Sequence, residues 1–345
     1  MTHPEGQPIT PTFADGVSPP QRPKSKRALV ITLSIVGAIV VSSAIAITVA
    51  ILNQARSPEA AVTRYVEFIA DGKAEAANRL VDPGIANDER VLLTDEVLGE
   101  STSPIEIVDV RSNYRTDSRA SVRVTLSIDG ERYEDDLSVV SGPKEALVLD
   151  TWRVEDPLLS QVSVSSNDLD SVTVGSTDVA LEDDGYGHHS RRLAAYPGVY
   201  EVSGASTDYV TASTESLRVV DKFSLGESVD VTLTPSEAFE KEVLKQVQAR
   251  VTACLTIPTN MEDGCPYAVR NDDLAELKVI TQPDGFSVIT LDSFAATEAT
   301  IAVRENPASY NPEPKLEKST IDVTGKVSLD GGKPKIEEVY MASGW

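Results

Sequence analysis

The sequence predicts an α+β exterior behind one transmembrane helix, and three observations carry this prediction. Residues 28–52 form a run of 25 residues without a charge. Apolar residues recur at helical spacing in residues 57–80 and 234–254. The stretches after both segments alternate apolar and polar residues, as half-buried β-strands do. We therefore expect modules in which helices come first and an antiparallel sheet follows.

The first 52 residues predict a tail and a membrane span. Residues 1–27 contain six prolines and few apolar side chains, so we expect a disordered tail. A helix over residues 28–52 would be about 37 Å long, enough to cross a hydrocarbon core of roughly 30 Å. A secretory signal has a shorter apolar region that follows a short basic start. Small residues in VSSAIAITVA leave signal cleavage open as an alternative, and a buried helix is a further one.

The charges on either side of the apolar run predict its orientation. Basic residues stay on the cytoplasmic side of a membrane. Four lie in the tail, namely Arg22, Lys24, Lys26 and Arg27, whereas only Arg56 follows closely. We therefore expect a single-pass protein of the plasma membrane with a cytoplasmic N-terminus and with residues 53–345 outside the cytoplasm.

The net charge excludes one class of partner. The chain carries −23, and because the tail carries +2, the outer part carries −25. A polyanion of this size is repelled by nucleic acid and by anionic lipid head groups. We expect no nucleic-acid partner, and a membrane contact only through the apolar run.

Residues 57–157 are expected to form the first α+β domain. Ser57 can cap a helix that has Pro58 at its first position, and Asp71-Gly72 can end it. A second short helix carries Ala77 and stops near Pro83. The strand pattern ASVRVTLSI then runs into Asp129-Gly130, a strong hairpin turn.

This layout resembles membrane-anchored bacterial proteins, of the Gram-positive type, that place an NTF2-like or cystatin-like domain outside the bilayer. The resemblance rests on SPEAAVTRYVEFIADGKAEAANRLVDP and on the closing TWRVEDPLL with Trp152. It implies a helix pair followed by a meander. Members of that fold include enzymes, ligand binders and assembly modules, so the resemblance confers no activity. The acidic catalytic residues of the enzymatic members are not identifiable in this sequence.

Residues 158–233 are expected to form a small β-sandwich. The runs SVTVGSTDVAL, GVYEVSG and YVTASTESLRVV are rich in β-branched residues and are separated by Gly, Asp and Ser. The pattern resembles extracytoplasmic modules of the PEGA kind. Such modules usually serve as spacers or as surface-binding units.

Residues 234–345 are expected to form a second α+β domain. Thr234 and Glu237 are spaced as a capping box, with Pro235 at the first helical position. Apolar residues then share one helical face: Phe239, Val243, Val247, Val251 and Cys254. Strand patterns follow, and Gly331-Gly332 links the last two as a hairpin.

Cys254 and Cys265 are the two cysteines of the chain, and we expect them to form a structural disulfide. They lie 11 positions apart, across a loop that contains Pro and Gly. The alternative is a thiol nucleophile of the sortase kind, which would use Cys254 with His188 or His189 and with Arg270. The Thr-Leu-x-Thr-Cys motif of those enzymes is absent from the sequence.

His188 and His189 invite the hypothesis of a metal site together with Asp183 and Asp184. Adjacent side chains in an extended loop point apart, and no further histidine follows residue 27 to complete the ligand set. We therefore expect a solvated loop and predict no metal, cofactor or catalytic residues.

These observations predict a non-catalytic protein of the cell envelope that binds or scaffolds a protein or a cell-wall polymer. The alternative is an envelope enzyme or small-ligand carrier that uses a pocket in an NTF2-like cone. The two differ in the interior of the first domain. A carrier or an enzyme needs a cavity there with a few convergent polar groups, whereas a scaffold has a filled interior.

Overall fold

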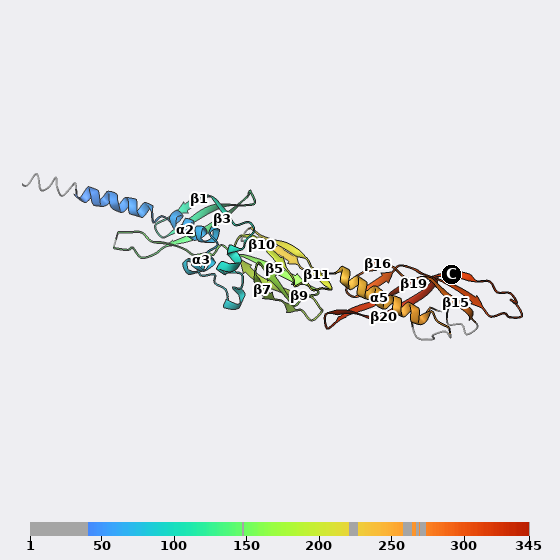
Figure 1. The fold of residues 1–345 in the computed structure, drawn as a ribbon. Coiled ribbons are helices and arrows are strands. Elements are labelled where there is room, and N and C mark those ends of the chain that lie inside the picture. The colour runs from blue at the N-terminus through green and yellow to red at the C-terminus, as the bar shows by residue number, and fades with distance from the viewer. Residues whose placement is uncertain are drawn as a thin grey trace, which may run out of the picture. The chain divides into compact units, whose positions relative to one another are not determined.

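The computed structural model describes residues 41–344 apart from residues 147, 221–226, 258–263, 267–268 and 270–273. The contacts divide the chain into two units. One unit runs to Arg56 and includes Lys144–Asp150, and the other comprises Ser57–Pro143 and Thr151–Trp345. Figure 1 shows the elements along the chain.

In the first unit, residues 41–54 form a helix whose end contacts the Lys144–Asp150 segment. The Asn53 side chain donates to the Val148 carbonyl over 3.1 Å and accepts from the Asp150 amide over 2.9 Å. Arg56 and Glu145 form an ion pair. Each of these contacts lies within the unit.

The second unit begins with helices and a four-stranded antiparallel sheet of order β1-β2-β3-β4. The helical elements are α2 (Pro58–Ala70), α3 (Ala74–Leu80), η1 (Asn87–Glu89) and α4 (Asp95–Gly99). The strands are β1 (Glu106–Arg115), β2 (Arg119–Ile128), β3 (Glu131–Ser141) and β4 (Trp152–Val154). Ser57 caps α2 by accepting from the Ala60 amide over 3.2 Å, as its sequence predicts.

The β2–β3 hairpin confirms the predicted turn. Asp129 and Gly130 both have positive φ, 53° and 79°, which a two-residue turn of this hand requires. Alternate β2 residues face α2 and are buried, but Thr125 and Ser127 on the other face are buried as well. The second face of β2 is therefore less exposed to solvent than its polar residues, Thr125 and Ser127, would suggest.

The described residues between positions 158 and 235 form strands and the turns between them. Two four-stranded sheets have the orders β12-β10-β6-β7 and β13-β5-β9-β8, and β11 pairs with β14. The strands are β5 (Ser160–Ser166), β6 (Ser171–Val174), β7 (Thr177–Ala180), β8 (Glu182–Asp183), β9 (His189–Ala195), β10 (Gly198–Ser203), β11 (Val210–Ala212), β12 (Thr214–Val219), β13 (Glu227–Asp230) and β14 (Leu233–Pro235). β13 and β5 are parallel, whereas the other pairs are antiparallel.

The C-terminal part places α5 (Glu237–Cys254) against a six-stranded antiparallel sheet (Figure 1). Its strands are β15 (Leu274–Thr281), β16 (Phe286–Ile289), β17 (Ser293–Ala296), β18 (Ala299–Glu305), β19 (Glu317–Asp330) and β20 (Lys333–Gly344). The predicted apolar stripe of α5 is fully buried against this sheet. Gly331 and Gly332 have positive φ at the β19–β20 turn, as expected.

The predicted capping box of α5 is wrong. Thr234 and Pro235 belong to β14, and Ser236 is the N-cap, accepting from the Phe239 amide over 3.2 Å. Pairing of β14 with β11 holds Thr234 in extended conformation, so that the helix starts later.

The buried apolar residues form two clusters. One spans residues 62–231 and contains both the helix-and-sheet layer and the strands that follow it. The other is formed by α5, the disulfide and the C-terminal sheet. The strands of residues 158–233 thus share a core with the preceding layer.

The predicted fold class is wrong, because the described structure is mostly β, with 47% strand and 22% helix. The helical periodicities do correspond to helices, but α3 and α4 are short, and α2 and α5 each pack against a sheet that contains more residues than the helix does. The placement behind a membrane span is also unsupported. Within residues 41–344, as far as they are described, no helix is both long enough and apolar enough to cross a bilayer. Residues 28–40 of the predicted span lie outside the described residues.

Candidate functional site

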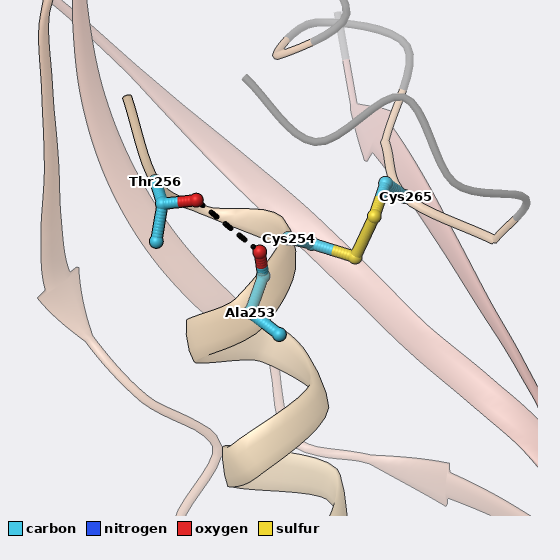
Figure 2. The surroundings of a disulfide bond; sticks show 4 residues. All are labelled: Ala253, Cys254, Thr256 and Cys265. Atoms are coloured by element: carbon cyan, nitrogen blue, oxygen red, sulfur yellow. Dashed lines mark hydrogen bonds between the residues drawn. A yellow bond between two sulfur atoms is a disulfide. The ribbon is translucent and has the colours of Figure 1, made fainter. Parts of the chain in front are cut away.

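Cys254 and Cys265 are bonded, with their Cα atoms 5.3 Å apart (Figure 2). Cys254 ends α5 and is fully buried, and Cys265 is 4% exposed. Neither sulfur is therefore a thiolate, which removes the nucleophile that the sortase-like alternative needs. Arg270, the third residue of that alternative, lies outside the described residues.

His188 and His189 lie at the end of the β8–β9 turn. The Nδ1 atom of His188 is 2.9 Å from the Asn167 side-chain oxygen. Asp184 accepts from the Tyr186 amide over 2.8 Å and from the His188 amide over 3.3 Å, and these bonds lower the pKa of Asp184. The Asp184 carboxylate thus stabilises the turn by accepting hydrogen bonds from its backbone. In the part of the chain that the structure describes, no group of three or more side chains is arranged to hold a metal ion.

The space between α2 and β2 is filled by side chains. From α2, Val62, Tyr65 and Val66 are 0% exposed, and the facing Val122 and Val124 of β2 are 0% exposed as well. A void large enough for one water molecule would give these side chains accessible area. The space that would be a ligand cone is therefore packed at this position.

The Tyr65 hydroxyl lies within this core and has a fixed partner. It accepts from the Leu158 amide over 3.0 Å, at the start of the strand-rich stretch. Nearby, the Tyr196 hydroxyl donates to the Asn78 side-chain oxygen over 2.7 Å, and the Tyr200 hydroxyl donates to the Tyr196 carbonyl over 2.8 Å. Each of these hydroxyls thus has a hydrogen-bond partner within the protein.

A groove of about 510 Å³ lies between α5 and β20. This volume falls within the range of roughly 300–1,000 Å³ that is usual for ligand sites. We refer to it as the α5–β20 groove, and its lining residues are Gln246, Arg250, Gly264, Ile336, Glu337, Glu338, Val339 and Tyr340.

The two ends of the groove are closed by hydrogen bonds to the outer edge of β20. At one end, the Gln246 side chain donates to the Pro334 carbonyl over 2.9 Å and accepts from the Ile336 amide over 3.1 Å. At the other end, the Gly264 carbonyl accepts from the Met341 amide over 3.2 Å. Both groups are amide-like, so each occupies the position that a neighbouring strand would take.

Gly264 is required at its end of the groove. Its φ is +88°, and a Cβ atom built on it would lie 2.2 Å from the Val339 carbonyl oxygen. Cys265 follows Gly264 directly in the sequence, so the bond from Cys265 to Cys254 anchors this glycine to the end of α5.

The carboxylates of the groove are paired. Hydrogen bonding to Ser328 and Lys335 lowers the pKa of Glu337. The Tyr340 hydroxyl and Lys326 likewise lower the pKa of Glu338. Both carboxylates therefore stay ionised, and neither has the raised pKa that a general acid requires at neutral pH.

The sequence did not point to this groove. Its one local signal is the spacing of Gln246 and Arg250, which lie one helical turn apart beside the buried stripe of α5. The β20 residues that line the groove are positioned by the pairing of β20 with β19, and no local sequence pattern predicts that pairing.

No protein-family model matches the sequence, and a search of curated proteins finds none that is significantly similar to it.

Proposed function

We propose that this chain is a non-catalytic binding or scaffolding protein that works outside the cytoplasm, with a protein or a cell-wall polymer as its partner. The observation that supports the proposal is the filled core between α2 and β2. Val62, Tyr65 and Val122, which would line a ligand cone, have no accessible surface. A small-ligand carrier, or an enzyme that binds its substrate between the helix and the sheet, needs an open cavity at this position.

The disulfide supports the location. Disulfides form and persist in oxidising compartments and are rare in the cytosol, and both cysteines of this chain are paired. The strongly acidic net charge of −23 fits a soluble exterior and disfavours nucleic acid as a partner. Attachment to a membrane through residues 28–52 stays a prediction from the sequence.

Cross-linking in intact cells tests the proposal. The full chain, with a photoreactive amino acid in place of an exposed tyrosine such as Tyr186, Tyr310 or Tyr340, is irradiated and its adducts are identified by mass spectrometry. We expect adducts with an extracytoplasmic protein or with wall polymer. Adducts with cytosolic proteins alone would contradict the location. A stoichiometric small molecule retained by the purified chain would favour the carrier instead.

A further inference from the structure

The helix of residues 41–54 exposes apolar side chains on more than one side. Ile45, Ile47 and Ile51 are 59%, 61% and 62% exposed. Ile45 and Ile47 are two positions apart, so they point to nearly opposite sides of a helix with about 3.6 residues per turn. A helix that is apolar all round is normally buried in a protein core or in lipid. The described protein leaves these side chains exposed, which favours lipid as the medium that buries them.

The Lys144–Asp150 segment is fixed at the end of this helix. The uncharged run ends at Leu52, and the next residue, Asn53, bonds the segment. Its side chain donates to the Val148 carbonyl over 3.1 Å and accepts from the Asp150 amide over 2.9 Å. Successive residues of a helix rise by about 1.5 Å, so the segment lies level with the end of the apolar run. Val148 is 47% exposed there.

The charges of this segment are neutralised by ion pairs. Lys144 Nζ is 3.3 Å from the Asp150 carboxylate, and Glu145 pairs with Arg56. Two basic and two acidic groups therefore cancel, in a chain whose net charge is −23. A paired charge is less costly to bring towards a phase of low dielectric constant than an unpaired one. The segment thus escapes the repulsion from lipid head groups that the acidic net charge causes.

We propose that the Lys144–Asp150 segment is a second membrane contact, in which Val148 enters the head-group region of a phospholipid bilayer beside Leu52. This inference rests on the proposed location outside the cytoplasm and adds lipid to the partners named there. Apolar side chains in such contacts lie roughly 5–10 Å deep, at the boundary of head groups and acyl chains. Burial of apolar surface drives the contact, so it needs no anionic lipid and persists at high salt.

Depth-dependent fluorescence quenching tests the inference. The full chain is reconstituted in phosphatidylcholine vesicles, with an environment-sensitive fluorophore on one new cysteine: Val148→Cys, Ile51→Cys or Tyr186→Cys. The native cysteines are bonded to each other, so only the new one is labelled. Tyr186, which is 95% exposed, supplies the reference for a fluorophore in water. We expect nitroxide-labelled lipids to quench the Val148→Cys and Ile51→Cys labels.

The Val148→Cys label decides the outcome. We expect its emission to shift to the blue in vesicles, and nitroxides near the head groups to quench it more than nitroxides deep in the acyl chains. Quenching no stronger than that of the Tyr186→Cys label would overturn the inference, whatever the Ile51→Cys label shows. A requirement for anionic lipid, or loss of quenching at high salt, would also overturn it.

A pair of variants tests how the segment is held at the bilayer. Asn53→Ala removes both hydrogen bonds to the segment. In this background we expect the Val148→Cys label to lose its quenching and the Ile51→Cys label to keep it. The matched control is Gln54→Ala, which changes an exposed neighbour and should leave both signals unchanged. Equal quenching of the Val148→Cys label in the two backgrounds would overturn the inferred arrangement.

The failure of this inference and the failure of the proposed function are distinguishable. If the Val148→Cys label is not quenched, but cell cross-links identify an extracytoplasmic partner, the lipid contact is refuted and the proposed function stands. If the label is quenched, but cross-links identify cytosolic proteins alone, the proposed function fails and the lipid contact stands.

Discussion

Among single residues, two tyrosines, Tyr65 and Tyr196, join the first sheet layer to the strands that follow it, and a third, Tyr200, bonds Tyr196. Tyr65 and Tyr196 are fully buried, and Tyr200 is 2% exposed. The hydroxyls of Tyr65 and Tyr196 bond to groups far away in the sequence, the Leu158 amide and the Asn78 side chain, whereas the Tyr200 hydroxyl bonds the Tyr196 carbonyl. A buried hydroxyl with a partner stabilises a specific packing, because breaking the bond leaves a polar group unsatisfied.

Removal of the Tyr196 hydroxyl should destabilise this core. The Tyr196→Phe variant leaves the Asn78 side-chain oxygen without its 2.7 Å donor, and we expect a loss of about 1–3 kcal/mol in the free energy of unfolding, measured in urea. The matched control is Tyr186→Phe, because Tyr186 is 95% exposed. Equal stabilities of the two variants would contradict the role of the hydroxyl.

Burial raises the pKa of Tyr196 to about 12, which predicts a dependence of stability on pH. A folded pKa above the unfolded value of about 10 means that the folded state disfavours the phenolate. This contribution is complete below pH 10 and is lost as the pH rises from 10 to 12. We expect unfolding midpoints to fall in this window, and to fall less in Tyr196→Phe than in the parent chain.

The disulfide is the second residue-scale feature. It closes a loop of 11 positions, for which the chain-entropy model gives about 2–3 kcal/mol. We expect the double variant Cys254→Ser/Cys265→Ser to lose about this much, and the Met341 amide to exchange faster because Gly264 is no longer anchored. Mass spectrometry without reductant should show no free thiol in the parent chain. Two free thiols in secreted material would refute the bond.

At the scale of elements, the start of α5 is decided by Ser236. Its hydroxyl accepts from the Phe239 amide and donates to the Asp208 carbonyl over 2.6 Å. We expect Ser236→Ala to cost about 1 kcal/mol of unfolding free energy, and Ser236→Gly to cost less, as at other N-caps. Thr234→Ala is the control for the incorrect capping box. A larger effect at Thr234 than at Ser236 would contradict the assignment.

The outer strands carry bulges. Val108 in β1 and Ile280 in β15 fall where the register shifts, and both are exposed, at 42% and 47%. Bulges interrupt the row of backbone groups and discourage pairing between copies. The bulge of β20 differs, because its extra residue, Glu337, lines the α5–β20 groove.

At the scale of the whole molecule, the second unit contains two apolar cores. The guanidinium of Arg218 in β12 donates to Glu131 over 2.9 Å and to the Tyr133 hydroxyl over 2.8 Å. These bonds fasten the strand-rich stretch to the β2–β3 hairpin, inside the region of the first core. The second core is built from α5, the disulfide and the last sheet.

Two cores predict two unfolding transitions for the full chain. In calorimetry, Tyr196→Phe should lower the transition temperature of one, and Cys254→Ser/Cys265→Ser that of the other, because the altered residues lie in different clusters. A single transition that both variants shift equally would show that the cores unfold as one.

Features that depend on neighbouring residues could be predicted from the amino-acid sequence. Ser57 and Pro58 start α2, the Asp129-Gly130 and Gly331-Gly332 pairs make the hairpins, and Cys254 lies close enough to Cys265 to pair. Each depends on φ/ψ preferences or spacings within about a dozen positions.

Contacts between distant segments set three features that the sequence did not reveal. These are the balance of strand over helix, the core shared by the first layer and the strand-rich stretch, and the α5–β20 groove. Thr234 shows why: its helical signal is local, but pairing of β14 with β11 overrides it. Gln246 meets Pro334 across 88 positions, and such contacts depend on which strands pair rather than on any local period.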